Sequence, residues 1–185
     1  LSRTKASDNS RLPYGRQSVD EDDIAAVAEV LRSDWLTTGP ATEAFERELA
    51  ETANARHAVA CSSGTAALHL VSLALGLTQN DIAVVPAVTF LATANAPHLA
   101  GADIVFTDVN PETGLVTPET LQQALVNTTS AKAVFAVHLN GQMAPVEALA
   151  ALVNEGGMHL IEDGCHALGG RYRCANGEEG IVGDC

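Results

Sequence analysis

The sequence predicts an α/β fold in which helices cover both faces of a mostly parallel β-sheet, a three-layer α/β/α arrangement. Short apolar runs alternate with helical stretches along most of the chain, which is typical of right-handed βαβ units. The runs are continuously apolar, as in strands that are buried on both faces. The 185 residues are 46% hydrophobic, which is enough for one domain with a substantial core.

Gly76 and Gly101 follow two of the helical stretches as stop signals, and Pro118 opens a third at its first turn. Five apolar runs are expected to be strands: Ala58–Cys61, Ile82–Val85, Asp103–Thr107, Ala133–Val137 and His159–Ile161. Four helices are expected between them: Thr65–Leu75, Leu91–Ala100, Pro118–Val126 and Ala144–Asn154.

The chain ahead of this block is predicted to form two more helices and a tail. Asp20–Leu31 is expected to be amphipathic, and Pro40–Ala50 follows it after the loop Leu36–Gly39. Residues 1–11 are polar, and we expect a disordered tail there. Residues 12–185 are expected to belong to one large domain, with no internal boundary. The residues expected on one side of the first helix are Ile24, Val27, Val30 and Leu31.

Composition and charge favour a cytoplasmic protein that binds neither nucleic acid nor membrane. The net charge is −13, and such a surface repels anionic polymers and lipids. No run approaches the roughly 18 apolar residues of a membrane span, and the polar start does not resemble a signal peptide. The cysteines lack the paired spacing of a zinc site, so we expect them to be reduced and structural. They are Cys61, Cys165, Cys174 and Cys185.

Ligands of open α/β sheets bind beyond the carboxyl ends of the strands, so the residues after each strand are the candidate site. Ser63, Gly64 and Thr65 form a small, hydroxyl-rich turn that opens a helix. Such a turn offers backbone N–H groups to a phosphate, although Ser63 is equally typical of an ordinary helix cap. Neither a G-x-G-x-x-G nor a P-loop motif occurs in the sequence.

Three further residues stand at strand ends, and each has two interpretations. Asp163 follows apolar strand residues, where it would pair with a protonated pyridine nitrogen or cap the next turn. Phe90 would stack on a flat ring or belong to the core. His166 would contact a cofactor hydroxyl or lie on the surface.

Taken in order, these motifs resemble those of a known family. The motifs are Ser63–Leu68, then Pro86–Phe90 with Ala92–Asn95, then Glu162–Asp163 with His166–Gly169, preceded by Tyr14–Gln17 and Leu36–Pro40. As an ordered set they resemble the DegT/DnrJ/EryC1/StrS sugar aminotransferases, which are fold-type I enzymes dependent on pyridoxal 5′-phosphate (PLP). The resemblance runs from about residue 12 to 185 and implies the N-terminal part of the PLP-binding large domain.

The resemblance also implies roles for individual residues. Ser63, Gly64 and Thr65 would contact the cofactor phosphate, Phe90 would stack on the ring, Asp163 would pair with its nitrogen, and His166 would contact its phenolic oxygen. Thr37, Thr38 and Gly39 would lie near the nucleotide-sugar, close to the partner subunit of a homodimer.

Two stretches resemble one branch of the family. Ser33–Thr37 and Cys165–Tyr172 are similar to the UDP-4-amino-4,6-dideoxy-N-acetyl-altrosamine transaminases of pseudaminic acid biosynthesis, and His166 stands where many relatives carry Gln. The resemblance implies a UDP-linked 4-keto-6-deoxy sugar as substrate and glutamate as amino donor.

The sequence departs from the family at the catalytic lysine, which the resemblance places beyond Cys185. Lys5 lies in the polar tail, and Lys132 enters a strand at the end opposite the ligand. We therefore expect these 185 residues alone to be inactive and to bind PLP weakly or not at all. A PLP-dependent sugar dehydratase, in which a histidine replaces the lysine, and a non-catalytic binding or oligomerising module stay open as alternatives.

Overall fold

The computed structural model describes residues 17–174 and 177–183, which divide between two compact units, residues 1–43 and 44–185. The expected tail at residues 1–11 lies outside the described residues. In the first unit, α1 (Glu21–Arg32) begins where Asp20 accepts hydrogen bonds from the N–H groups of Asp22 and Asp23. Such a cap satisfies N–H groups that have no partner within the helix.

The apolar side of α1 stays exposed in the described chain: Ile24, Val27 and Leu31 are all accessible. The next helix, α2 (Pro40–Thr52), begins in the first unit and ends in the second. None of the helices in the described ranges is both long and apolar enough to cross a membrane.

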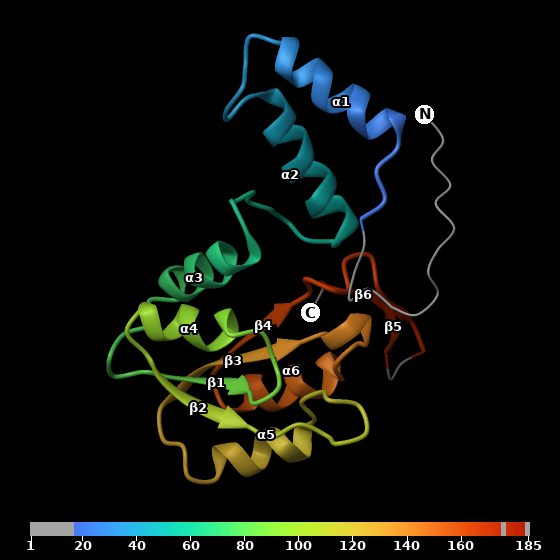
Figure 1. The fold of residues 1–185 in the computed structure, drawn as a ribbon. Coiled ribbons are helices and arrows are strands. Elements are labelled where there is room, and N and C mark those ends of the chain that lie inside the picture. The colour runs from blue at the N-terminus through green and yellow to red at the C-terminus, as the bar shows by residue number, and fades with distance from the viewer. Residues whose placement is uncertain (1–16, 175–176, 184–185) are drawn as a thin grey trace, which may run out of the picture. The chain divides into compact units, whose positions relative to one another are not determined.

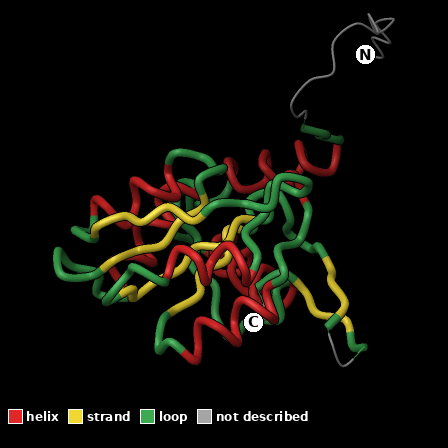
Figure 2. The backbone as a smooth tube through the Cα atoms, turned by 90° about the horizontal axis from the view of Figure 1, so that it is seen from below, coloured by secondary structure: helices red, strands yellow, loops and turns green. Residues whose placement is uncertain are grey.

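The second unit is built on a four-stranded parallel sheet in the order β2-β1-β3-β4. The strands are β1 (Ile82–Pro86), β2 (Asp103–Thr107), β3 (Ala131–Val137) and β4 (His159–Asp163). They confirm four of the predicted strands; β3 begins two residues earlier than expected and β4 ends two residues later. Figure 2 shows the strands as neighbouring extended segments.

Helices cover both faces of this sheet, as predicted (Figure 1). On one face, Val85, Phe135 and Ile161 pack with α3 (Gly64–Ala74) and α4 (Ala92–Leu99). On the other face, Val84 and Val134 pack with α5 (Pro118–Leu125) and α6 (Val146–Glu155). Because side chains alternate along a strand, odd-numbered residues of β4 face α3 and even-numbered ones face α6.

The predicted strand Ala58–Cys61 is wrong. The segment has no strand partner among the described residues, and Val59 is 77% exposed. The Ala60 N–H donates to Glu46 Oε1 at 2.7 Å instead of to a neighbouring strand. A strand requires a ladder of backbone hydrogen bonds, which an apolar run alone does not supply.

A short antiparallel pair, β5 (Arg171–Arg173) and β6 (Glu179–Ile181), was not predicted. It stands apart from the four-stranded sheet in both views (Figures 1 and 2). Arg171 Nη1 donates to Glu179 Oε2 at 3.1 Å across the pair. Charged residues of this kind give no apolar run from which a strand could have been inferred.

Candidate functional site

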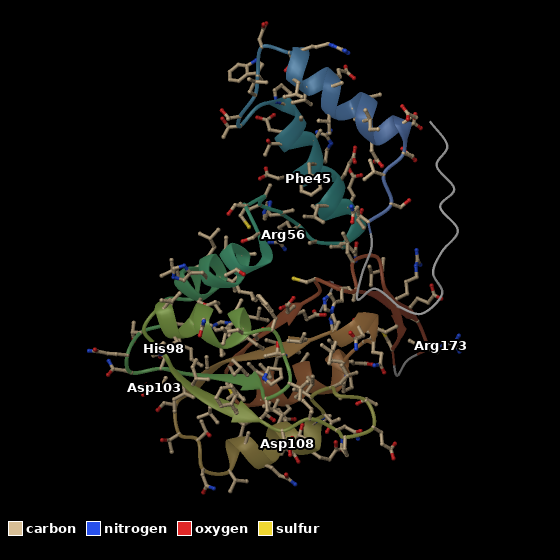
Figure 3. All side chains as sticks on the ribbon, viewed as in Figure 1. Phe45, Arg56, His98, Asp103, Asp108 and Arg173 are labelled. Atoms are coloured by element: carbon tan, nitrogen blue, oxygen red, sulfur yellow. The ribbon has the colours of Figure 1, made fainter. Side chains whose placement is uncertain are left out.

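The carboxyl ends of the parallel strands lie at one edge of the sheet and the amino ends at the other. Figure 3 shows the two ends of β2: His98 and Asp103 mark the side where the strand begins, and Asp108 follows its last residue. The predicted site residues Phe90 and Asp163 belong to the same edge as Asp108, because they follow or end parallel strands.

The Gly64 turn lies directly against the turn that follows Asp163. A side chain at Gly64 would bring its Cβ within 2.9 Å of Cys165 Sγ. Ser63 Oγ accepts a hydrogen bond from Ala66 N at 3.2 Å, so Ser63 is also a helix cap. The N–H groups of Gly64 and Thr65 open the helix, where backbone donors have no acceptor within the helix itself. The fold thus brings together two segments that are about 100 residues apart in the sequence.

Asp163 is a nearly buried carboxylate at the end of β4, the outermost strand of the sheet on the β3 side. It is 8% exposed, and Oδ1 accepts a hydrogen bond from Cys165 N at 3.1 Å. The turn-capping interpretation is therefore correct for this oxygen. No ion pair within the described residues involves Asp163. Its side chain lies on the α3 face of the sheet, the face to which the Gly64 turn belongs.

Phe90 is 72% exposed, which excludes the core interpretation of this residue within the described fold. The loop that carries it is held next to a buried threonine: Thr89 Oγ1 and Thr93 Oγ1 are 2.8 Å apart. The ring is thus presented at the surface from an anchored loop.

His166 is exposed, and its Nδ1 accepts a hydrogen bond from Asn140 N at 3.3 Å. In a neutral imidazole the proton then resides on Nε2, which makes that atom the donor. The loop that provides Asn140, residues 138–144, follows β3 and lies next to the Asp163–His166 turn, since a Cβ at Gly141 would lie 3.3 Å from the His166 carbonyl oxygen.

The other residues singled out from the sequence are Thr37, Thr38, Gly39 and Lys132. Thr37, Thr38 and Gly39 belong to the first unit, and their proximity to a nucleotide-sugar stays a prediction. Lys132 lies near the amino end of β3, where Nζ donates to the Gly76 carbonyl at 2.7 Å and approaches Asp81 Oδ2 at 3.4 Å. Gly76 follows the last turn of α3, whereas the Gly64 turn opens that helix.

Sequence reasoning assigned no role in the site to three residues of this region: His138, Glu162 and Cys165. His138 and Glu162 are polar groups next to buried apolar strand residues, and that position was the signal that could have singled them out. Nothing local in the sequence indicates that Cys165 lies against Gly64.

The pKa of the Cys165 thiol depends on the neighbouring Asp163 carboxylate. Cys165 is exposed as a whole, but partial burial of its thiol is the largest cause of a pKa raised to about 11 from an ordinary 9.0, followed by the hydrogen bond to Asp163 and its negative charge. At pH 8 the thiolate fraction is then about 100-fold smaller than for an ordinary thiol, and the thiolate is the reactive form.

We therefore expect iodoacetamide to alkylate Cys165 slowly at pH 8, with a rate that rises about tenfold per pH unit until the pH approaches 11. Asp163→Asn should accelerate the reaction at pH 8, because it removes the negative charge but not the burial. Site-resolved mass spectrometry measures the rate, with Cys61 as internal reference. A Cys165 rate that levels off below pH 9.5, or that ignores Asp163→Asn, would contradict this description.

Comparison with known proteins identifies the fold. Residues 17–184 match the model of the DegT/DnrJ/EryC1/StrS aminotransferase family. DesV of S. venezuelae, solved with a ketimine intermediate, is 35% identical with a TM-score of 0.77; the match covers 81% of this chain and 40% of DesV. 3-Amino-5-hydroxybenzoic acid synthase is 32% identical with a TM-score of 0.81, over 90% of this chain and 42% of the synthase.

A protein of Streptococcus pneumoniae described as a sugar aminotransferase, in its PLP form, is 29% identical with a TM-score of 0.80, over 88% of this chain and 45% of its own. The chain thus spans less than half the length of each of these three structures. The predicted α/β fold with a mostly parallel sheet matches that of PLP-dependent aminotransferases. The chain belongs to the DegT/DnrJ/EryC1/StrS aminotransferase family.

Proposed function

We propose that this chain supplies the cofactor-binding part of a PLP-dependent aminotransferase that acts on a nucleotide-linked 4-keto-6-deoxy sugar. The single observation that carries the proposal is the contact between the Gly64 turn and the Asp163–His166 turn. The helix start at Gly64 and the nearly buried Asp163 carboxylate both contact Cys165, which supports a common site for them. A phosphate and a protonated ring nitrogen on one small molecule require these two groups at one site.

The residues of this site fit PLP on three grounds. The lack of a side chain at Gly64 lets the helix start approach Cys165 closely, since a Cβ there would lie 2.9 Å from Cys165 Sγ. Asp163 is nearly buried and forms no ion pair within the described residues. A protonated ring nitrogen would compensate the desolvation of its carboxylate. Phe90 presents an exposed ring instead of packing in the core. PLP, when bound, supplies an electron sink for the electrons released at the amino-bearing carbon.

Each residue then has a defined task. The N–H groups of Gly64 and Thr65, with Ser63, bind and orient the phosphate. Asp163 accepts a hydrogen bond from the ring nitrogen and stabilises its proton. Phe90 covers one face of the ring and excludes water from it. His166 donates from Nε2 toward the phenolic oxygen, since its Nδ1 already accepts from Asn140.

Lys132 does not fit the role of the Schiff-base lysine. Its ammonium group donates to the Gly76 carbonyl at the end of α3 opposite the Gly64 turn. Lys5 lies outside the described residues. We therefore propose that Lys132 is not the lysine which moves the proton during amino transfer, and that residues 1–185 alone bind the cofactor without turnover.

For the substrate we propose a UDP-linked 4-keto-6-deoxy-N-acetylhexosamine, with glutamate as amino donor, in a cytoplasmic homodimer. The motifs Ser33–Thr37 and Cys165–Tyr172 support this choice, together with relatives described as sugar aminotransferases. Thr37, Thr38 and Gly39 would then contact the nucleotide-sugar.

The test is amino transfer by a protein that carries this chain and a Schiff-base lysine, with the UDP-linked keto sugar and glutamate. We expect an amino sugar and one 2-oxoglutarate for each amine formed, both measured by mass spectrometry. Loss of a sugar hydroxyl without gain of nitrogen would support the dehydratase instead. The absence of both products in a protein with bound cofactor would support a binding module.

A further inference from the structure

His138 and Glu162 form a buried pair that the proposed cofactor contacts leave unused. His138 is fully buried, and the Glu162 side chain is 10% exposed. His138 Nε2 and Glu162 Oε2 are 3.0 Å apart. Because buried polar groups are costly unless they are paired, each residue of the pair satisfies the other, and their hydrogen bond fixes the two side chains relative to each other.

The hydrogen bonds fix the tautomer of His138. Its Nδ1 accepts from Ala144 N at 3.1 Å, and a backbone N–H can only donate. The proton of the ring therefore resides on Nε2 and is donated to the Glu162 carboxylate. Through a single ring, His138 thus joins the end of β3 to the end of β4 and to the loop that leads into α6.

The pair lies directly behind Asp163. In the register of β3 and β4, Ala136 is opposite Glu162 and Val137 is opposite Asp163. His138 N also donates to the Asp163 carbonyl at 3.1 Å. Since side chains alternate along β4, Glu162 lies on the α6 face and Asp163 on the α3 face. The Asp163 carbonyl is therefore held by the His138 backbone N–H, and the His138 ring holds the side chain of the neighbouring residue Glu162 on the α6 face.

The same ring also holds the loop that contacts His166. Ala144, which donates to His138, ends the loop in which Asn140 donates to His166 Nδ1. A shift of His138 would thus move both the carboxylate of Asp163 and the donor that sets the His166 tautomer.

We infer that His138 and Glu162 are positioning residues that hold Asp163 and His166 in the geometry of the cofactor site. This inference rests on the proposed function for its consequence, cofactor binding. The positioning itself can be tested without the cofactor. The alkylation rate of Cys165 in the unliganded protein depends on how the Asp163 carboxylate lies against the thiol.

The experiment compares Glu162→Leu, which removes the acceptor, with Glu162→Gln, whose amide oxygen can still accept from Nε2. Glu155→Leu, an exposed position on α6, is the matched control. In Glu162→Leu we expect Cys165 alkylation at pH 8 to rise about threefold or more, the change that about half a pKa unit produces. We expect affinity for pyridoxamine 5′-phosphate to fall about tenfold. Glu162→Gln and Glu155→Leu should both stay within twofold of wild type.

Wild-type values of both quantities in a folded Glu162→Leu protein would overturn the inference. If the wild type does not bind pyridoxamine 5′-phosphate, the proposed function fails, and the Cys165 rates still decide the inference. Should Glu162→Leu fail to fold, long-range ¹H–¹⁵N spectra of the wild type provide the second test. The expected spectrum shows the Nε2–H tautomer of His138, and an Nδ1–H tautomer would overturn the inference.

Discussion

Asp163→Asn is expected to lower kcat for amino transfer by about two or more orders of magnitude, in a protein that joins this chain to the Schiff-base lysine. The substitution keeps the shape of the side chain and removes the charge that stabilises a proton on the cofactor ring. The cofactor would still bind through the Gly64 turn and Phe90, so the loss should fall on kcat more than on cofactor occupancy. Asp163→Ala should weaken cofactor binding more than Asp163→Asn does, because it leaves a buried neighbour without its partner.

Single-turnover amino transfer to a UDP-linked 4-keto-hexosamine measures this effect, with cofactor occupancy checked by absorbance. Asp108→Asn is the matched control, because Asp108 follows the parallel strand β2 at the same edge of the sheet but is exposed (Figure 3). Its kcat should be unchanged. Near-normal turnover by a fully loaded Asp163→Asn protein would mean that Asp163 only caps its turn.

Phe135→Ala is expected to reduce the free energy of unfolding by about 3–5 kcal/mol, because it leaves a cavity in the middle of the sheet. Phe135 is fully buried in β3 opposite Ile161 and packs in the cluster under α3 and α4. Whole domains have a free energy of unfolding of only about 5–15 kcal/mol, so this substitution would remove a large part of the stability of the fold. Urea denaturation followed by circular dichroism measures the loss.

Phe90→Ala removes the same side chain from an exposed position and is the control for Phe135→Ala. Its free energy of unfolding should change by about 0.5 kcal/mol or less, while affinity for the cofactor falls about 3–10-fold through lost stacking. If Phe90→Ala destabilised the fold as much as Phe135→Ala, Phe90 would be a core residue, and its assignment to the site would be wrong.

Most of the sheet and its helices could be predicted from the sequence because their signals are local. β1 and β2 are continuous apolar runs bounded by turn residues, and α5 begins where Thr117 caps a helix that opens with Pro118. Gly76 and Gly101 end α3 and α4 with positive φ values of 63° and 112°, which glycine adopts at no steric cost. Each of these signals lies within or next to the element that it predicts and does not depend on contacts with distant segments.

The parts that could not be predicted depend on distant partners. Ala58–Cys61 has the composition of a strand, but a strand forms only where another strand supplies hydrogen bonds. The contact of Gly64 with Cys165 and the tautomer of His138 follow from the packing of segments far apart in the sequence. The spacing of the apolar runs identified the strand ends. The burial of Asp163 and the His138–Glu162 pair depend on packing between distant segments, so they could not be inferred from the sequence.

The most direct test of the cofactor site is the binding of pyridoxamine 5′-phosphate to residues 1–185, measured by calorimetry. This amine form cannot form a Schiff base with Lys5 or Lys132, so any binding reports the site itself. Saturable binding of one molecule per chain is expected, weakened about tenfold by Asp163→Asn, on the scale of a hydrogen bond to a charged group, and unchanged by Asp108→Asn. Binding that is absent, or that is equal in the wild type and in Asp163→Asn, would contradict the assignment of Gly64 and Asp163 to one cofactor site.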